Sequence, residues 1–257
     1  MSRRAPFACL PLVAVAAGTL TWLGAAELET PARAFTVVLI GLLPPLLLVQ
    51  AAAAPEEFEH LPVAPVYVSS MAFIWMLGIA ALWAGTASGF THEQLGLRTL
   101  PVASLLAWTG GLTLAALSIA VLGRALRWTE SPLLEWLLPK SPRERAVFAL
   151  VSLSAGIGEE MAFRGFLIPA LRVASGSMFI AVAVSSLAFG MMHSYQRIGG
   201  ALRASALGAL LATPMIVTGS VIPSMAAHAA FDLLVGLVLA NWLLGRDTEK
   251  RSRGREH

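Results

Sequence analysis

The chain is dominated by apolar runs about as long as a helix needs to cross a lipid bilayer. They recur from the N-terminal region to near the C-terminus, and one helical crossing takes about 20 apolar residues. Backbone polar groups have no water partners in lipid, so only helices and closed barrels can span it. The alternating pattern of barrel strands is absent from the sequence. We therefore expect an all-α, polytopic transmembrane helical bundle.

Composition agrees with a chain whose main environment is the lipid bilayer. Of the 257 residues, 57% are hydrophobic and 13% are charged, whereas soluble domains carry about 25% charged residues. The formal net charge is +3, but the basic residues fall in connecting segments and at the ends, so we expect no nucleic-acid partner. The single cysteine, Cys9, excludes an intrachain disulfide. No internal repeat is evident, and residues 1–257 are expected to form one integral membrane domain.

The apolar runs predict about eight spans. Pro44 and Pro45 predict a kink in the second span, and Arg203 and Pro214 make the seventh the weakest. The connection at 124–145 contains an apolar and tryptophan-rich stretch that predicts an interfacial helix before span five. The expected spans are 7–23, 34–54, 66–87, 102–122, 146–171, 178–192, 202–217 and 221–244.

Charge distribution predicts the orientation. With eight spans, 14 of the 18 Lys and Arg residues lie on one side and 3 on the other, and basic loops favour the cytoplasm. Both termini are therefore expected in the cytoplasm, with residues 246–257 a disordered tail. The first span resembles a signal peptide, but an uncleaved helix is preferred because further spans follow. The Ala-, Gly- and Arg-rich composition indicates a bacterium, hence its inner (plasma) membrane.

Three charges interrupt the fifth span, within the segment Gly158–Gly165. They belong to Glu159, Glu160 and Arg164, and a charge at the centre of a membrane costs about 2.5–3.5 kcal/mol on insertion scales. Glu160 and Arg164 are four residues apart and share one helix face, so we expect them to pair. Glu159 points about 100° away from Glu160 and requires another partner.

Two further predicted spans carry ionisable residues. His193 ends span six, and Phe189 lies one helical turn before it. His228 and Asp232 are four residues apart in span eight and share one face of that helix. Ionisable residues at membrane depth normally face the bundle interior and mark a function. We therefore consider these residues together with Glu159 as a candidate site.

Two kinds of hydrolytic chemistry fit this set. Without a metal, Glu159 would accept a proton from water with the help of His193, and His228 with Asp232 would stabilise an oxyanion. With a metal, Glu159, His193 and His228 would hold Zn²⁺ and leave a fourth position for water. In a third interpretation the polar residues only pair with one another and hold the bundle together.

Other hydrolytic motifs are missing from the sequence. There is no GxSxG sequence for a serine nucleophile. His92 and Glu93 begin an HExxH-like pattern, but Gly96 stands where the second histidine would be.

The order of the charged motifs resembles the CAAX protease and bacteriocin-processing family, also called the CPBP or Abi family. The resemblance covers about residues 141–244, which we take as the catalytic core, and the segment Leu95–Arg98 is similar to a weaker upstream feature of the family. The motifs are EExxxR, FxxxH and HxxxN/D, formed here by Glu159, Glu160, Arg164, Phe189, His193, His228 and Asp232.

The resemblance implies an intramembrane protease. Glu159 would be the general base, acting with His193 on water, and His228 with the residue four positions on would form the oxyanion site. Glu160 and Arg164 would shape the site, with Phe189 in support. The family has been classed as metalloproteases, and a metal-free glutamate mechanism is also proposed for it.

One departure concerns position 232. The branch that cleaves prenylated CAAX proteins has Asn there, whereas this chain has Asp232. An amide donates a hydrogen bond to an oxyanion, and an ionised carboxylate repels it. Asp232 would have to be protonated, orient His228, or bind a metal. The expected substrate is therefore a protein or peptide in or at the membrane, without assuming a prenylated CAAX sequence.

We thus expect an intramembrane endopeptidase with the carboxylate of Glu159 and the rings of His193 and His228 around one polar cavity. The alternative is a non-proteolytic membrane immunity or partner-binding protein on the same scaffold. A proton-coupled transporter ranks last, since no repeat is visible.

Overall fold

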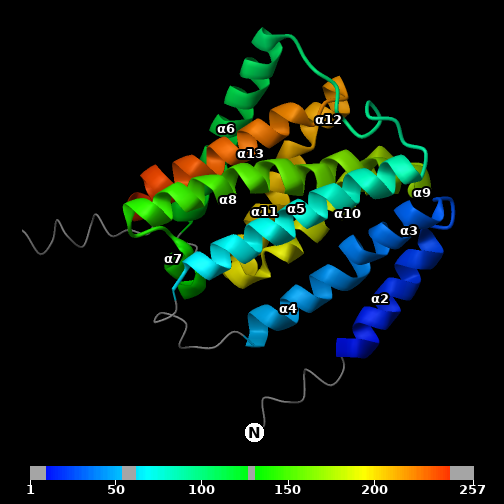
Figure 1. Cartoon of the computed structure of the whole chain (residues 1–257), viewed down its shortest axis with the longest axis horizontal. Helices are drawn as coiled ribbons and strands as arrows, with labels where there is room; N and C mark the ends of the chain where they lie inside the picture. Colours follow the sequence, from blue (N-terminus) through cyan, green and yellow to red (C-terminus); the bar gives the residue numbers. More distant parts are fainter. Residues whose placement is uncertain (1–9, 54–61, 127–130, 244–257) are drawn as a thin grey trace, which may run out of the picture.

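The structure is a computed structural model that describes residues 10–53, 62–126 and 131–243. Helices and no strands occur in these ranges (Figure 1), which confirms the all-α bundle. In chain order the elements are α2 (Leu10–Gly24), α3 (Thr30–Thr36), η1 (Val37–Leu42), α4 (Leu43–Ala53), α5 (Ala64–Ala87), α6 (Val102–Ala125), α7 (Pro132–Leu137), α8 (Pro142–Glu160), η2 (Met161–Leu167), α9 (Ile168–Ser175), α10 (Met178–Met192), η3 (Ser194–Gln196), α11 (Arg197–Leu211), α12 (Thr213–Thr218), α13 (Ile222–Leu234), η4 (Val235–Leu239) and α14 (Ala240–Leu243).

Among the described residues, six helical stretches are long and apolar enough to cross a membrane. The chain is therefore a multi-pass membrane protein. Two shorter apolar helices, Val13–Gly24 and Met178–Met192, fall in the first and sixth predicted spans. The six long stretches are Thr30–Leu48, Ala64–Ala87, Val102–Ala125, Pro142–Ser175, Ser194–Thr218 and Ile222–Leu239. The expected tail 246–257 and Cys9 lie outside the described residues.

The helix that carries the paired glutamates begins with a strong start signal. The Ser141 hydroxyl accepts from the Glu144 backbone N–H, and the Glu144 carboxylate accepts from the Ser141 backbone N–H. This reciprocal arrangement is a capping box, and Pro142 follows at a position where a missing N–H is tolerated. The sequence Ser-Pro-Arg-Glu thus fixes the first turn of α8, four residues before the expected start at 146.

Helix α8 lies between α5 and α13 (Figure 1). A Cβ on Gly156 would lie 2.5 Å from the carbonyl oxygen of Met225 in α13, and a Cβ on Gly158 would lie 2.5 Å from that of Ile74 in α5. Only glycine allows the backbones to approach so closely, which is how helices gain contact in lipid. The two glycines therefore bring α5 and α13 against α8 just before Glu159.

The long central helix is not a uniform α-helix. Directly after Glu160 it continues as η2, a π-helix, and then as α9. All residues of η2 are buried, and π segments inside α-helices often occur at functional sites. The helical stretch is thus longer than the expected span 146–171. Its hydrogen-bonding pattern changes from α to π immediately after the glutamates.

The second predicted span shows how a helix accommodates consecutive prolines. The π segment η1 ends at Leu42, and Pro44 and Pro45 follow in the first turn of α4. Because each proline lacks an N–H and crowds the carbonyl four residues earlier, a wider turn before them relieves the clash. The helix continues through both prolines. The irregularity next to the prolines, where a kink was predicted, is this π segment.

The loop between α5 and α6 braces both helices of the candidate site. Leu95 is fully buried in the main core, which also contains residues of η2. The Gly96 carbonyl accepts from the Val221 backbone N–H at 2.9 Å, and the Arg98 carbonyl accepts from the Ser220 hydroxyl at 2.6 Å. The segment Leu95–Arg98 therefore joins the η2 side of the bundle to the start of α13.

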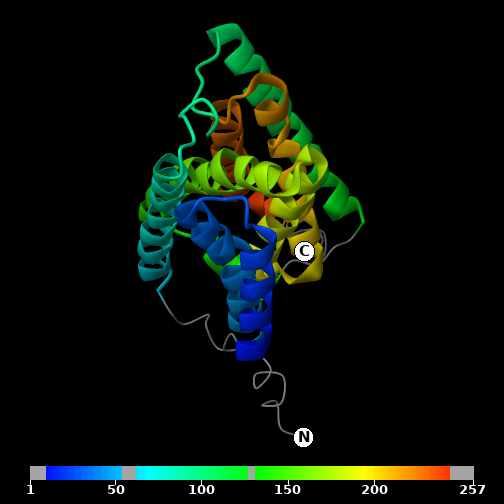
Figure 2. The same ribbon diagram turned by 90° about the vertical axis from the view of Figure 1, so that its right-hand side faces the viewer.

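The expected helix before span five is present as α7. Trp136 is buried against Val63 and Tyr67 at the start of α5, and the Tyr67 hydroxyl donates to the Leu137 carbonyl. Helix α7 is therefore fixed to the bundle at the end where α8 begins (Figure 1). Figure 2 shows the N-terminal helices (blue) and the start of α6 (green) at opposite ends of the bundle.

The close approach of α8 and α13 predicts that Gly156→Ala destabilises the protein. The added methyl group meets backbone and Ala229 rather than a flexible side chain, and overpacking of this kind costs about 1–3 kcal/mol. Gly110→Ala is the matched control, because a Cβ there meets nothing within 4 Å and helix propensity favours Ala over Gly by about 1 kcal/mol. Thermal unfolding in detergent should lower Tm for Gly156→Ala and maintain or raise it for Gly110→Ala. Equal responses would contradict the close packing.

Candidate active site

The Glu160 carboxylate and the Arg164 guanidinium form a buried ion pair. Arg164 Nη1 lies 2.9 Å from Glu160 Oε1, and the side chains are 1% and 0% exposed. This is the pair that the four-residue spacing predicts. Two opposite charges at such depth require each other, because an isolated buried charge carries a large desolvation penalty.

The same carboxylate oxygen also holds a histidine from another helix. His228 Nδ1 lies 2.8 Å from Glu160 Oε1. An ionised carboxylate is only an acceptor, so Nδ1 carries the proton and donates it. Glu160 thus joins α8 to α13 and fixes the orientation of the imidazole. The sequence had assigned Glu160 to Arg164 alone.

The other imidazole nitrogen lies near two carboxylates. His228 Nε2 is 4.0 Å from Glu159 Oε2 and 3.6 Å from Asp232 Oδ2. The Glu159 and Asp232 side chains are 19% and 31% exposed, whereas His228 is 8% exposed. The two partly exposed side chains therefore lie on the Nε2 side of the ring, and the fully buried carboxylate of Glu160 lies on the Nδ1 side.

Phe189 lies at the centre of the aromatic contacts in the site. Its ring centroid is 4.6 Å from that of His193 and 6.0 Å from that of His228. The Arg164 guanidinium carbon lies 4.2 Å from the centre of the same ring, in range of a cation–π interaction. Phe189 therefore contacts both histidines and packs on the guanidinium of the buried ion pair.

His193 is held by its own helix. Its Nδ1 lies 2.9 Å from the Phe189 carbonyl oxygen, which can only accept, so the proton is on Nδ1 and Nε2 is left as an acceptor. His193 and Glu159 make no hydrogen bond or ion pair in the described part of the chain. Of the three groups expected around one cavity, Glu159 and His228 form a direct ion-pair contact, whereas the aromatic contacts of His193 are with Phe189 and Tyr195.

Helix α11 completes the surroundings of Arg164. Arg164 Nε donates to the Gly208 carbonyl at 3.4 Å, and a Cβ on Gly208 would lie 3.2 Å from Arg164 Nη2. Gly208 could not be predicted from the sequence, because one glycine in an apolar run carries no signal. Tyr195, whose ring centroid is 6.0 Å from that of His193, was not predicted either.

The expected zinc ligands do not form a compact set here. Across residues 10–53, 62–126 and 131–243, no three His, Cys, Asp or Glu side chains are grouped to hold a metal ion. Zinc requires each donor at about 2.0–2.2 Å, and His193 contacts neither Glu159 nor His228 directly. Zinc binding stays a prediction that metal analysis of the purified protein can test, and no step below passes through a metal.

The buried pair predicts a strong dependence of stability on Glu160. Glu160→Gln leaves Arg164 without its counter-ion, which costs about 3–5 kcal/mol for buried pairs. The double variant Glu160→Gln/Arg164→Met removes both charges and should recover most of that loss. Unfolding of the variants in detergent, with Glu159→Gln as the partly exposed neighbouring control, measures these differences. Additive losses in the double variant would contradict the pairing.

Comparison with known proteins identifies the same part of the chain. A family model described as type II CAAX prenyl endopeptidase Rce1-like matches residues 142–234, from the first residue of α8 to the last of α13. Searches of curated proteins and of solved structures gave no match. The matched segment contains both glutamates and both histidines of the site, and it makes the chain a peptidase. This match supports the resemblance of residues 142–234 to the CAAX protease and bacteriocin-processing family of intramembrane proteases.

Proposed function

We propose that the protein hydrolyses a peptide bond of a membrane-associated protein or peptide, with Glu159 as general base and His228 at the oxyanion. The observation that carries this proposal is the 4.0 Å separation of Glu159 Oε2 and His228 Nε2. The base must lie near the attacking water, and the oxyanion donor must lie near the carbonyl that this water attacks. Glu159 on α8 and His228 on α13 face each other closely enough to act on one such carbonyl group.

Glu159 can take the role of base because its side chain is partly exposed and its buried Oε2 has no hydrogen-bond partner among the described residues. A polar separation of 4.0 Å is wide enough for a bridging water to be considered. In the reaction, Glu159 accepts a proton from water while the water oxygen bonds to the carbonyl carbon. When the C–N bond breaks, the carboxylic acid returns that proton to the leaving amine.

His228 can stabilise the oxyanion when its Nε2 carries a proton. Glu160 accepts from Nδ1–H at 2.8 Å and balances the positive charge of the ring. Asp232 Oδ2, 3.6 Å from Nε2, adds a second negative charge beside that proton. This arrangement favours a role for Asp232 in orienting and charging His228, so the missing Asn amide is not required at the oxyanion.

His193 can assist the attacking water. Its Nδ1 proton is committed to the Phe189 carbonyl, so Nε2 presents a lone pair that accepts a hydrogen bond from water. Glu159 and His193 would thus contact the water from two helices, while Phe189 keeps His193 apart from the positive side of the site.

The substrate class follows from the environment. The matched family model is named for CAAX prenyl endopeptidases. The site lies in helices that are long and apolar enough to cross a membrane. We infer a lipid-embedded or lipid-anchored peptide as substrate, in a bacterial inner membrane with both termini of the enzyme in the cytoplasm. The alternative, a non-proteolytic immunity protein, leaves the accessible carboxylate of Glu159 without a purpose.

Glu159→Gln should reduce peptide cleavage by about 10²–10⁴-fold, the usual contribution of a general base. The assay uses protein reconstituted in vesicles and a library of quenched fluorescent peptides, each with and without a lipid anchor. Glu93→Gln, which changes an exposed loop residue, is the matched control and should retain full activity. Cleavage that persists in Glu159→Gln would favour the non-proteolytic alternative.

Asp232→Asn tests how residue 232 acts. If its carboxylate stabilises the Nε2 proton of His228, the variant should lower kcat about tenfold or more with KM unchanged, because the lost interaction belongs to the transition state. Measured kcat and KM for the best library peptide decide the point. An unchanged or higher kcat would mean that residue 232 contacts the oxyanion itself.

A further inference from the structure

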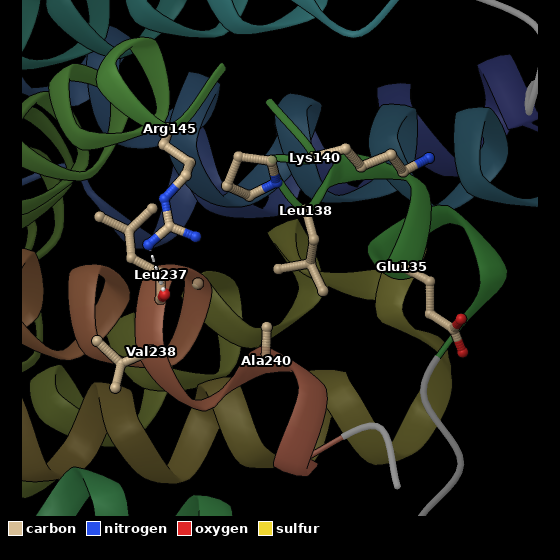
Figure 3. A pocket seen from close by; sticks show the side chains of 9 residues that line it. Glu135, Leu138, Lys140, Arg145, Leu237, Val238 and Ala240 are labelled. Carbon is tan, nitrogen blue, oxygen red and sulfur yellow. Dashed lines mark hydrogen bonds between the residues drawn. The ribbon is translucent and has the colours of Figure 1, made fainter. Parts of the chain in front are cut away.

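A polar pocket lies apart from the candidate active site, where two membrane-crossing stretches end. It has a volume of about 310 Å³ and is lined by Glu135, Leu138, Pro139, Lys140, Arg145, Gly236, Leu237, Val238 and Ala240 (Figure 3). The stretch Pro142–Ser175 begins here, and the stretch Ile222–Leu239 ends here. Ends of spans lie at the membrane surface, so the pocket faces the level of lipid headgroups.

Arg145, together with Lys140, is one of two cationic residues that line this pocket. Its Nη2 donates to the Leu237 carbonyl at 3.0 Å (Figure 3), and a guanidinium carries five N–H donors in all. The side chain is exposed, so the remaining donors are open to a ligand. The guanidinium fork binds phosphate oxygens in pairs, which makes Arg145 a suitable anchor for a phosphate group.

The other charges around the pocket also favour an anion. Lys140 and Arg143 are both exposed within the same short segment as Arg145. Glu135 is the one acidic residue of the lining, and it lies at the end opposite Arg145 (Figure 3). Glu135 has an interaction of its own. Glu144, the acidic residue of the same segment, directs its carboxylate to the backbone N–H groups of Lys140 and Ser141, so Arg145 is the residue best placed to bind an anion.

The size of the pocket and its mixed polar and apolar lining fit a lipid headgroup better than a free ion. Leu138, Leu237 and Val238 line the pocket beside Arg145, and a volume of about 310 Å³ is roughly ten times the ~30 Å³ of one water molecule. A bare phosphate leaves most of this space and these walls without contact. A phosphodiester that continues into glycerol and acyl chains contacts both the guanidinium and the apolar side chains.

We propose that this pocket binds the headgroup of an anionic phospholipid, with its phosphate on Arg145. The expected cytoplasmic position of the segment agrees with this ligand, because that leaflet is rich in anionic lipid and attracts basic segments beside membrane helices. The bound lipid would hold the first turn of α8 and the segment η4 together. These elements continue into the helices that carry Glu160 and His228.

The test counts lipids retained by the full-length protein. The protein is placed in nanodiscs of equal phosphatidylglycerol and phosphatidylcholine, and native mass spectrometry measures bound lipid after release. We expect one phosphatidylglycerol per chain, at least fivefold lower occupancy in Arg145→Gln, and a change below twofold in Arg143→Gln. Arg143 is the matched control, because it is exposed in the same turn but does not line the pocket.

Further arms separate the possible causes of binding. Ala240→Phe fills the pocket without changing any charge and should also abolish retention, while Tm confirms that each variant is folded. Equal losses in Arg143→Gln and Arg145→Gln would show a diffuse surface attraction and overturn the proposal. So would retention of phosphatidylcholine at the same level, or full displacement of the lipid by millimolar inorganic phosphate. None of these readouts depends on peptidase activity, so they stand whether or not the proposed catalytic roles do.

Discussion

A single buried carboxylate oxygen connects the helices on which the candidate site depends. Glu160 Oε1 accepts from Arg164 at 2.9 Å and from His228 at 2.8 Å, and the Glu160 side chain is completely buried. In a low-dielectric interior an unpaired charge is costly, whereas two donors on one carboxylate satisfy it. Any shift of α13 along α8 would break this arrangement, so the relative position of the two helices is fixed by charge as well as by packing.

Small residues make this electrostatic arrangement geometrically possible. Gly156 brings α13, and Gly158 brings α5, to backbone contact with α8 just before the glutamates. Gly208 leaves space for Arg164 beside α11. Helices in lipid associate through close packing rather than through the hydrophobic effect. The change to the π-helix η2 follows directly after Glu160, so the site lies where backbone geometry and side-chain charge both depart from those of a simple apolar helix.

Exposure divides the charged residues by role. Glu160 and Arg164 are buried and compensate each other, which stabilises the bundle. The side chains of Glu159 and Asp232 are 19% and 31% exposed, and both lie near Nε2 of His228. The basic pocket at the ends of α8 and η4 is chemically distinct, since it offers donors to an anion and no carboxylate next to a histidine.

The sequence by itself determined the helical class, the membrane environment and the Glu160–Arg164 pair, because these depend on local composition and on a fixed spacing along one helix. It also identified the three helices that carry the motifs. Only the tertiary structure decided that Glu160 bonds His228, that Glu159 lies next to His228 rather than His193, and that Phe189 contacts both histidines. Such contacts depend on helix rotation and depth, which the glycine packing and the π segment set, and no pattern within a single helix encodes them.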